Sequence, residues 1–119
     1  MEAKVIPGLR ELGIGVTAYG VLGRGLISGA RPTEKTDFRR FLPRFTGAAG
    51  EANRQLIASL DTIAADLGAT TPQLAIAWAL YRGDDIVPLL GSRTVAQVES
   101  SLKAQTLVIT LHRRQTFPK

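Results

Sequence analysis

Two short runs of β-branched and apolar residues constrain the fold of this chain more than any other feature. Residues 14–19 and 86–90 lie next to glycine or turn residues, a pattern typical of buried strands. Helical patterns precede and separate the two runs, so the order of elements predicts an α/β chain with parallel strands. Two strands with their helices are too few to cover both faces of a sheet. We therefore expect an incomplete α/β domain that is a fragment, self-associates or is only marginally stable alone.

Three helices are predicted before the second strand, and they are residues 5–12, 51–67 and 71–82. The longest carries an apolar stripe in which Leu56, Leu60 and Ile63 recur at spacings of three and four. The next helix has Thr71 as its expected N-cap and Pro72 as its first residue, a position where proline is tolerated. A fourth helix is expected after the second strand.

A long segment, residues 20–50, separates the first strand from the longest helix and is rich in Gly, Pro, Arg and Phe. Long loops inside compact domains are usually functional, but a partly disordered connection fits this composition equally well. Within the segment, Phe38, Phe41, Leu42 and Phe45 are spaced to pack a short helix or a lid. Both interpretations of the segment stay open at this point.

Charge and composition exclude several classes of function. The 119 residues carry a net charge of +5, but the basic residues are dispersed except for a cluster at His112, Arg113 and Arg114. We therefore expect no nucleic-acid partner. The absence of cysteine excludes disulfides and thiolate metal sites, and no metal site is predicted. No apolar run has membrane-spanning length, and residues 1–4 begin no long apolar run, so we expect no signal peptide and a cytoplasmic protein with no membrane contact.

Tyr19 and the glycine-rich residues after it form the first candidate ligand site, residues 19–25, which we name the first anchor. An aromatic ring at the carboxyl end of a strand is placed to stack on a flat ligand. Gly20, Gly23 and Gly25 allow backbone N–H groups to approach a phosphate, and Arg24 adds a planar cation that suits the same ligand. Taken alone, the pattern is more typical of a flexible turn with a surface arginine.

The second candidate site, residues 91–97, is named the second anchor and also lies between a strand and a helix. Ser92 and Arg93 precede the start of that helix, where the N-terminal N–H groups favour an anion. Thr94 and Gln97 have the spacing of a capping box, so Gln97 has two competing roles. The sequence does not rank these roles.

Taken together, the two anchors resemble the aldo-keto reductase family. The stretch RELGIGVTAYGVLGRGLISG is similar to the seventh strand and following loop of that family, and TTPQLAIAWALYRGDDIVPLLGSRTVAQVESSL is similar to its seventh helix, eighth strand and cofactor-binding helix. The resemblance covers residues 5–108. It implies the C-terminal part of a (β/α)₈ TIM barrel, namely the last two strands and their helices. A complete barrel of this kind needs about 250 residues.

The resemblance also implies an NADP (NADPH) site. Tyr19 matches the residue that stacks on the nicotinamide, the rest of the first anchor matches the loop around the pyrophosphate, and the second anchor matches the segment at the adenosine 2′-phosphate. Ser101 stands where the family commonly has an Asn, and Ser100 stands where it has a Glu. The implied cofactor contacts are Tyr19, Gly20, Leu22, Gly23, Arg24, Gly25, Gly91, Ser92, Arg93, Gln97 and Ser101.

The family's catalytic Asp, Tyr, Lys and His lie in its N-terminal half, and none of them is matched here. Tyr81 on a helix, Lys4 before a helix and His112 in the basic tail have structural or solvated roles instead. We therefore expect residues 1–109 to form a partial NADP-dependent oxidoreductase domain with a divergent tail at 110–119. The parent family reduces a small-molecule carbonyl by hydride transfer, and this chain alone is expected to be inactive. The alternatives are a non-catalytic fragment that completes a barrel with a partner, through self-association or a missing N-terminal half, and a truncated gene product.

Overall fold

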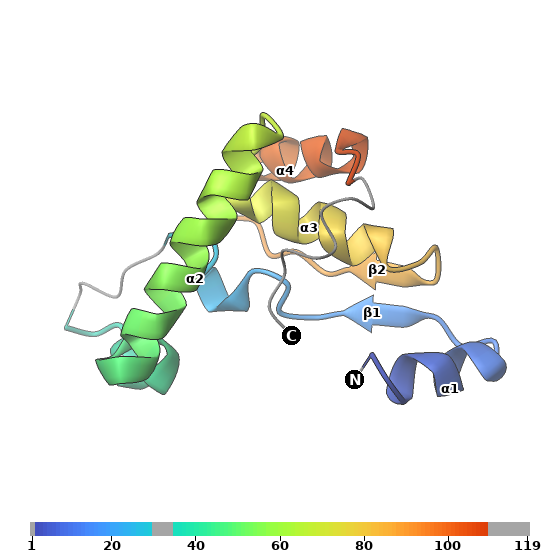
Figure 1. Ribbon diagram of the computed structural model, residues 1–119, viewed down its shortest axis with the longest axis horizontal. Helices are drawn as coiled ribbons and strands as arrows, with labels where there is room; N and C mark the ends of the chain where they lie inside the picture. The colour runs from blue at the N-terminus through green and yellow to red at the C-terminus, as the bar shows by residue number, and fades with distance from the viewer. Residues whose placement is uncertain (1, 30–34, 110–119) are drawn as a thin grey trace.

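The computed structural model describes residues 2–29 and 35–109, and its centre is a sheet of two parallel strands (Figure 1). Strand β1 (Val16–Ala18) pairs with β2 (Ile86–Pro88), with Val16 opposite Ile86 and Ala18 opposite Pro88. Both strands are shorter than the predicted 14–19 and 86–90. Pro88 is the last residue of β2, as its position in the sequence predicts, because proline cannot donate to the ladder.

Helices α3 and α4 lie on one side of this sheet, α2 lies beyond its carboxyl end, and α1 lies at the amino end of β1 (Figure 1). In Figure 1, α3 lies between β2 and α4, and α2 crosses beyond the ends of the strand arrows. The α/β class and the partial character of the fold are confirmed. The helices of the described ranges are α1 (Val5–Glu11), η1 (Gly23–Gly25), η2 (Phe38–Phe41), η3 (Pro43–Phe45), α2 (Gly47–Asp66), α3 (Thr71–Tyr81), α4 (Val95–Leu102) and η4 (Lys103–Thr106).

Helix α3 is the centre of the core and begins with a capping box. The Thr70 hydroxyl accepts the Gln73 N–H at 3.4 Å, and the Gln73 side-chain oxygen accepts the Thr70 N–H at 3.0 Å. The prediction of Thr71 as the N-cap is wrong by one residue, because Gln73 stands three residues after Thr70 and closes the box with it. The apolar side chains that α3 buries are Leu74, Ile76, Ala77 and Ala79.

Helix α2 begins at Gly47, four residues before the predicted start at Glu51. Its first turn, Gly-Ala-Ala-Gly, has no apolar stripe, so the spacing of large residues does not indicate it. Gly50 is buried in this turn against the backbone of Phe45, the last residue of η3. A Cβ atom at position 50 would lie 2.6 Å from the Phe45 carbonyl carbon. The last residue of η3 can therefore lie against α2 because position 50 has no side chain.

Replacement of Gly50 by alanine is expected to lower the free energy of unfolding by about 1–3 kcal/mol, the usual cost of overpacking. The clash is with backbone atoms of Phe45, which cannot rotate away as a side chain can. Gly8→Ala is the matched control, because Gly8 lies in α1 with open space around its Cβ position. Urea unfolding followed by circular dichroism measures both variants. An equal effect of the two substitutions would contradict the close approach at position 50.

The packed interior is small for a chain of this length. Among the described residues, four of the seven buried apolar residues are alanines, and no large side chain is less than 2% exposed. The radius of gyration is 15.4 Å, whereas a complete domain of this length would have about 13.5 Å. Val87 on β2 is 57% exposed and Leu56 on α2 is 49% exposed. These values confirm the expectation that apolar faces are left uncovered.

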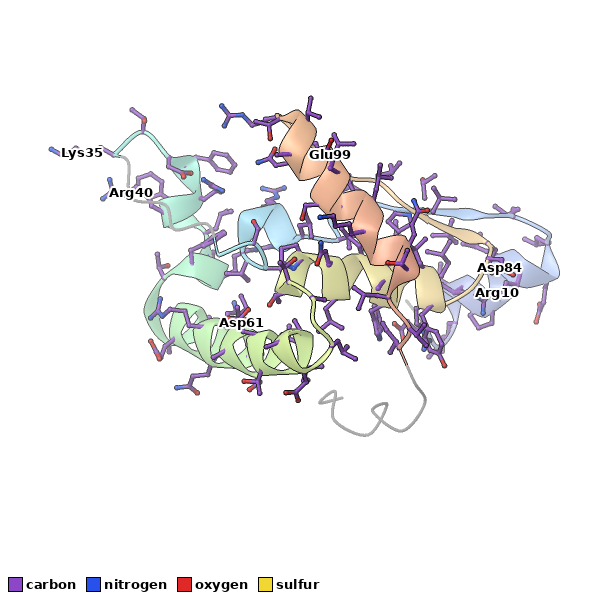
Figure 2. All side chains as sticks on the ribbon, turned by 90° about the horizontal axis from the view of Figure 1, so that it is seen from above. Arg10, Lys35, Arg40, Asp61, Asp84 and Glu99 are labelled. Atoms are coloured by element: carbon purple, nitrogen blue, oxygen red, sulfur yellow. The ribbon has the colours of Figure 1, made fainter. Side chains whose placement is uncertain are left out.

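An ion pair attaches α1 to the turn before β2. Arg10 donates from Nε and Nη2 to the two carboxylate oxygens of Asp85, each at 2.8 Å. The same Nη2 also donates to the Arg82 carbonyl oxygen at 2.8 Å. Figure 2 shows Arg10 beside Asp84, the neighbour of Asp85. The Arg10 hydrogen bonds hold the pKa of Asp85 below its ordinary value of 3.8. No periodicity in the sequence indicates this contact, since its partners are 75 residues apart.

The Arg10–Asp85 pair is expected to make stability depend on pH in the acid range. Because the pKa of Asp85 is depressed in the folded chain, its contribution is present above pH 3.8 and is lost as the pH falls through the depressed value. Asp85→Asn removes that contribution at neutral pH. Urea unfolding of both proteins between about pH 6 and pH 2 should show curves that converge at the acid end. A difference in the free energy of unfolding that stays constant over this pH range would show that the pair does not act through the ionisation of Asp85.

Candidate functional site

The two anchors leave the sheet at the same edge. Ala18 and Pro88 are paired as the last residues of β1 and β2, and the Leu89 N–H donates to the Ala18 carbonyl oxygen at 3.0 Å. Tyr19 therefore follows one strand directly beside the point where the second anchor follows the other. The arrows of β1 and β2 point the same way in Figure 1, toward the glycine-rich loop and α2. The Tyr19 side chain is 84% exposed at this edge, which leaves its ring free for a flat ligand.

A shared part of the core supports both anchors from beneath. Leu22 from the first anchor and Leu90, which precedes the second, pack against one cluster of buried residues. That cluster consists of Ile76 and Ala77 from α3 and Ala104 from η4. Segments about seventy residues apart in the chain are thus held by the same three side chains. The parallel pairing and this core together fix the spacing of the two anchors.

The first anchor is a tight turn with a left-handed backbone. Gly20, Gly23 and Gly25 have φ angles of 76°, 58° and 91°, which L side chains rarely adopt. The Gly23 N–H donates to the Gly20 carbonyl oxygen at 2.8 Å, and the Gly25 N–H donates to the Leu22 carbonyl oxygen at 3.0 Å. The expectation that these two N–H groups face a ligand is therefore wrong, because the turn itself uses them. The glycines serve the turn, and the exposed side chains of Tyr19 and Arg24 are left to meet a ligand.

Arg24 is the one non-glycine residue with positive φ among residues 2–29 and 35–109, at 59°. Such a backbone costs free energy for a residue with a Cβ atom, and it recurs at functional sites. Arg39 of η2 donates to the Arg24 carbonyl oxygen at 3.2 Å and is itself paired with Asp37. The Arg39 hydrogen bonds lower the pKa of Asp37, which keeps this support charged. Sequence reasoning missed both Asp37 and Arg39, although the Phe38–Phe45 segment does form short helices as one of its interpretations expected.

The second anchor combines an exposed turn with the start of α4. Gly91, Ser92 and Arg93 are exposed, and the Thr94 hydroxyl accepts the Gln97 N–H at 3.3 Å as an N-cap. The Gln97 side-chain oxygen accepts the Arg93 N–H at 2.7 Å. The capping box is therefore displaced by one residue, because Gln97 binds the N–H before the N-cap. Of the two roles open to Gln97, the structure uses the one at the helix start.

Ser92 and Ser101 line one cavity of about 520 Å³ between β2, α3 and α4. Most of its other lining residues are apolar, and they include Val98 and Leu102 on the same face of α4. Ser101 is half-buried there, one residue after Ser100, whose contacts run to α3. One cavity thus brings together Ser92 of the second anchor and Ser101, the residue that stands where the family commonly has an Asn.

Two findings bear on other kinds of site. No group of three or more His, Cys, Asp or Glu side chains in residues 2–29 and 35–109 is arranged to hold a metal ion. Within the same ranges, no helix is both long and apolar enough to cross a membrane. The basic cluster at His112, Arg113 and Arg114 lies outside the described residues, as does the tail expected at 110–119.

Comparison with known proteins shows which family the chain belongs to. The sequence profile described as "Aldo/keto reductase family" matches residues 1–114, which is nearly the whole chain. The chain belongs to the aldo/keto reductase family. Its similarity to the family, first indicated by the two anchors, therefore extends over the helices and strands that carry them.

Individual aldo/keto reductases show how much of a relative this chain spans. It is 33% identical to a probable aldo-keto reductase from Glycine max over 107 residues, which is 87% of this chain and 31% of that protein. The structure of a glycerol dehydrogenase from Gluconobacter oxydans is similar with a TM-score of 0.85 and 26% identity. That match covers 97% of this chain and 36% of the dehydrogenase. The chain therefore spans about a third of the length of these relatives.

Proposed function

We propose that this chain forms the cofactor-binding end of an NADP-dependent aldo-keto reductase, an oxidoreductase that reduces a carbonyl to an alcohol. In this proposal β1 and β2 are the last two strands of a (β/α)₈ barrel. The observation that carries the proposal is the parallel pairing that brings both anchors to one carboxyl edge of the sheet. Barrel enzymes build their sites at this end of their strands. The family membership and the resemblance of the glycine-rich loop support the same assignment.

The residues at the edge fit a dinucleotide in their chemistry. The exposed ring of Tyr19 suits the flat nicotinamide, and the exposed Arg24 beside it suits a pyrophosphate. Ser92 and Arg93 stand at the positive end of α4 and suit the 2′-phosphate that distinguishes NADPH from NADH. When bound, this cofactor supplies a hydride for transfer to the carbonyl carbon. The role proposed for the chain's own residues is to hold the cofactor and set its orientation.

Catalysis in this proposal needs residues that the chain does not supply. No residue of the sequence matches the family's Asp, Tyr, Lys and His, so the proton donor must come from another segment. Thr17 and Val87 are paired across the two strands and are both exposed on the same face of the sheet. In a closed barrel this face points inward and is covered by the other strands. We infer that the missing strands, carried by another polypeptide or an adjoining segment, complete the site.

A titration of the purified chain with NADPH tests the cofactor proposal directly. Trp78 is a partly exposed residue of α3 and lines a cavity with Ala18 and Val21 at the first anchor, so its fluorescence and that of NADPH both report binding. Saturable binding is expected for the wild type and a weaker affinity for Tyr19→Ala, because the stacking surface is lost. The chain alone is expected to reduce no carbonyl substrate. A lack of saturable binding at millimolar NADPH would refute the assignment of a cofactor site to this chain alone.

A further inference from the structure

We infer that Gln73 is a positioning residue that fixes helix α4, and with it the second anchor, through a hydrogen-bonded bridge to Ser100. The cofactor consequence of this inference rests on the proposed function, but the position of α4 does not. Gln73 lies on α3 and does not touch either anchor, so it acts only through the helix it holds. The family's usual residue at position 100 is Glu, and here the position is occupied by a serine that accepts from Gln73.

The Gln73 side chain uses both ends of its carboxamide. Its oxygen accepts the Thr70 N–H at 3.0 Å and so completes the N-terminal cap of α3. Its nitrogen donates to the Ser100 carbonyl oxygen at 2.9 Å and lies 3.3 Å from the Ser100 hydroxyl oxygen. The residue is only 9% exposed, so few water molecules are available to replace a lost partner. We call the two contacts to Ser100 the Gln73–Ser100 bridge.

Helix α4 has little else to hold it against the rest of the chain. None of its residues is fully buried, and its apolar residues Val95, Val98 and Leu102 are all exposed. Its carboxyl end is attached through Ala104 of η4, which is 1% exposed in the core. Packing therefore fixes one end of the helix, and the bridge fixes its position one turn after the second anchor. A helix with so small a buried face depends on such directional contacts for its orientation.

The position of α4 determines the geometry of the whole second anchor. Gln97 lies one turn before Ser100 and binds the Arg93 N–H, so a tilt of the helix moves the turn at Arg93. Ser101, the next residue after the bridge, lines the cavity that also contains Ser92. Displacement of α4 would therefore alter the adenosine end of the proposed site, while Tyr19, which follows β1, would keep its place.

The two roles of Gln73 can be separated by one substitution. Gln73→Glu keeps an oxygen for the Thr70 N–H but replaces the N–H₂ donor with a carboxylate oxygen facing the Ser100 carbonyl. The Ser100 hydroxyl can still donate to that carboxylate, so Ser100→Ala removes the remaining contact. In the wild-type background Ser100→Ala should have a small effect on the position of α4, because the Gln73 nitrogen keeps its hydrogen bond to the carbonyl oxygen at position 100. The two substitutions are therefore expected to be non-additive.

Amide hydrogen exchange of the full chain, read by mass spectrometry, tests the bridge without any ligand. Exchange in α4 is expected to rise about twofold in Ser100→Ala, about threefold in Gln73→Glu and about thirtyfold in the double variant. Exchange in the first turn of α3 should stay unchanged, because the cap is retained. An effect of the double variant equal to the product of the single effects would overturn the inference. Equal acceleration in α3 and α4 would overturn it as well, since it would indicate general loosening.

Binding experiments then connect the bridge to the second anchor. The double variant should bind NADPH about tenfold more weakly than the wild type. It should bind reduced nicotinamide mononucleotide, which has no adenosine, as the wild type does. Equal weakening for both compounds would contradict a role confined to α4. If the wild type binds neither compound, the proposed function fails, and the exchange data still decide whether Gln73 positions α4.

Discussion

Arg93→Ala is expected to lower the affinity of the chain for NADPH about 100-fold and to leave its affinity for NADH unchanged. The Arg93 side chain is exposed at the start of α4, and its N–H is fixed by Gln97 at 2.7 Å. A guanidinium at this position can form two charged hydrogen bonds to a 2′-phosphate, each worth about 1.5 kcal/mol. Their loss corresponds to about two orders of magnitude in the dissociation constant. NADH has no 2′-phosphate, so the affinity for NADH should not change.

Titration calorimetry with both cofactors measures this difference. Arg54→Ala is the matched control, because Arg54 is an exposed arginine that pairs with Glu51 on α2, away from the second anchor. That control should bind NADPH as the wild type does and should show that the loss does not follow from reduced net charge. Equal losses of affinity for NADPH and NADH in Arg93→Ala would place the arginine elsewhere on the cofactor. An unchanged affinity for NADPH would remove Arg93 from the site.

The fold was predictable to the extent that regular spacing and end signals mark its elements. The stripe containing Leu56 and Leu60 predicted α2, and Pro88 predicted the end of β2. The start of α2 was not predictable from spacing, because its first turn is built from small residues and requires Gly50 against the backbone of η3. The N-cap at Thr70 was available from the capping-box rule, but the rule for proline at the first helical position favoured Thr71.

The two segments of the candidate site could be identified from the sequence, but most of the contacts that shape them could not. Tyr19 and Arg93 were identified from their neighbours in the sequence and from the resemblance, and their assignment to a cofactor stays a prediction. The use of the Gly23 and Gly25 N–H groups within the turn was not predicted, because a tight turn and a phosphate-binding loop need glycines at the same positions. The contact from Arg39 to Arg24 spans 15 residues of a segment without periodic spacing. Contacts of this kind depend on the folded chain and leave no local signal.

Addition of the missing strands is expected to convert this chain from an inactive protein into a reductase. Co-expression with the N-terminal portion of an aldo-keto reductase that carries the catalytic Asp, Tyr, Lys and His should give NADPH-dependent carbonyl reduction. A positioned general acid alone contributes about 10²–10⁴ to the rate, so activity should rise at least about 100-fold above the background. The physical reason is that parallel sheets are stable when both faces are covered, and here the face with Thr17 and Val87 is open.

Val87→Glu tests whether that open face is where the missing strands dock. Val87 is 57% exposed, so a carboxylate there is solvated in the chain alone and should leave its unfolding unchanged. In a closed barrel the same carboxylate would be buried without a partner, which costs several kcal/mol and should abolish the complementation. Leu56→Glu is the control, since Leu56 is 49% exposed on α2 rather than on the sheet. Oxidation of NADPH and co-purification of the two polypeptides measure the outcome. Activity that survives Val87→Glu and is lost with Leu56→Glu would place the docking surface on α2 and leave the sheet face without this role.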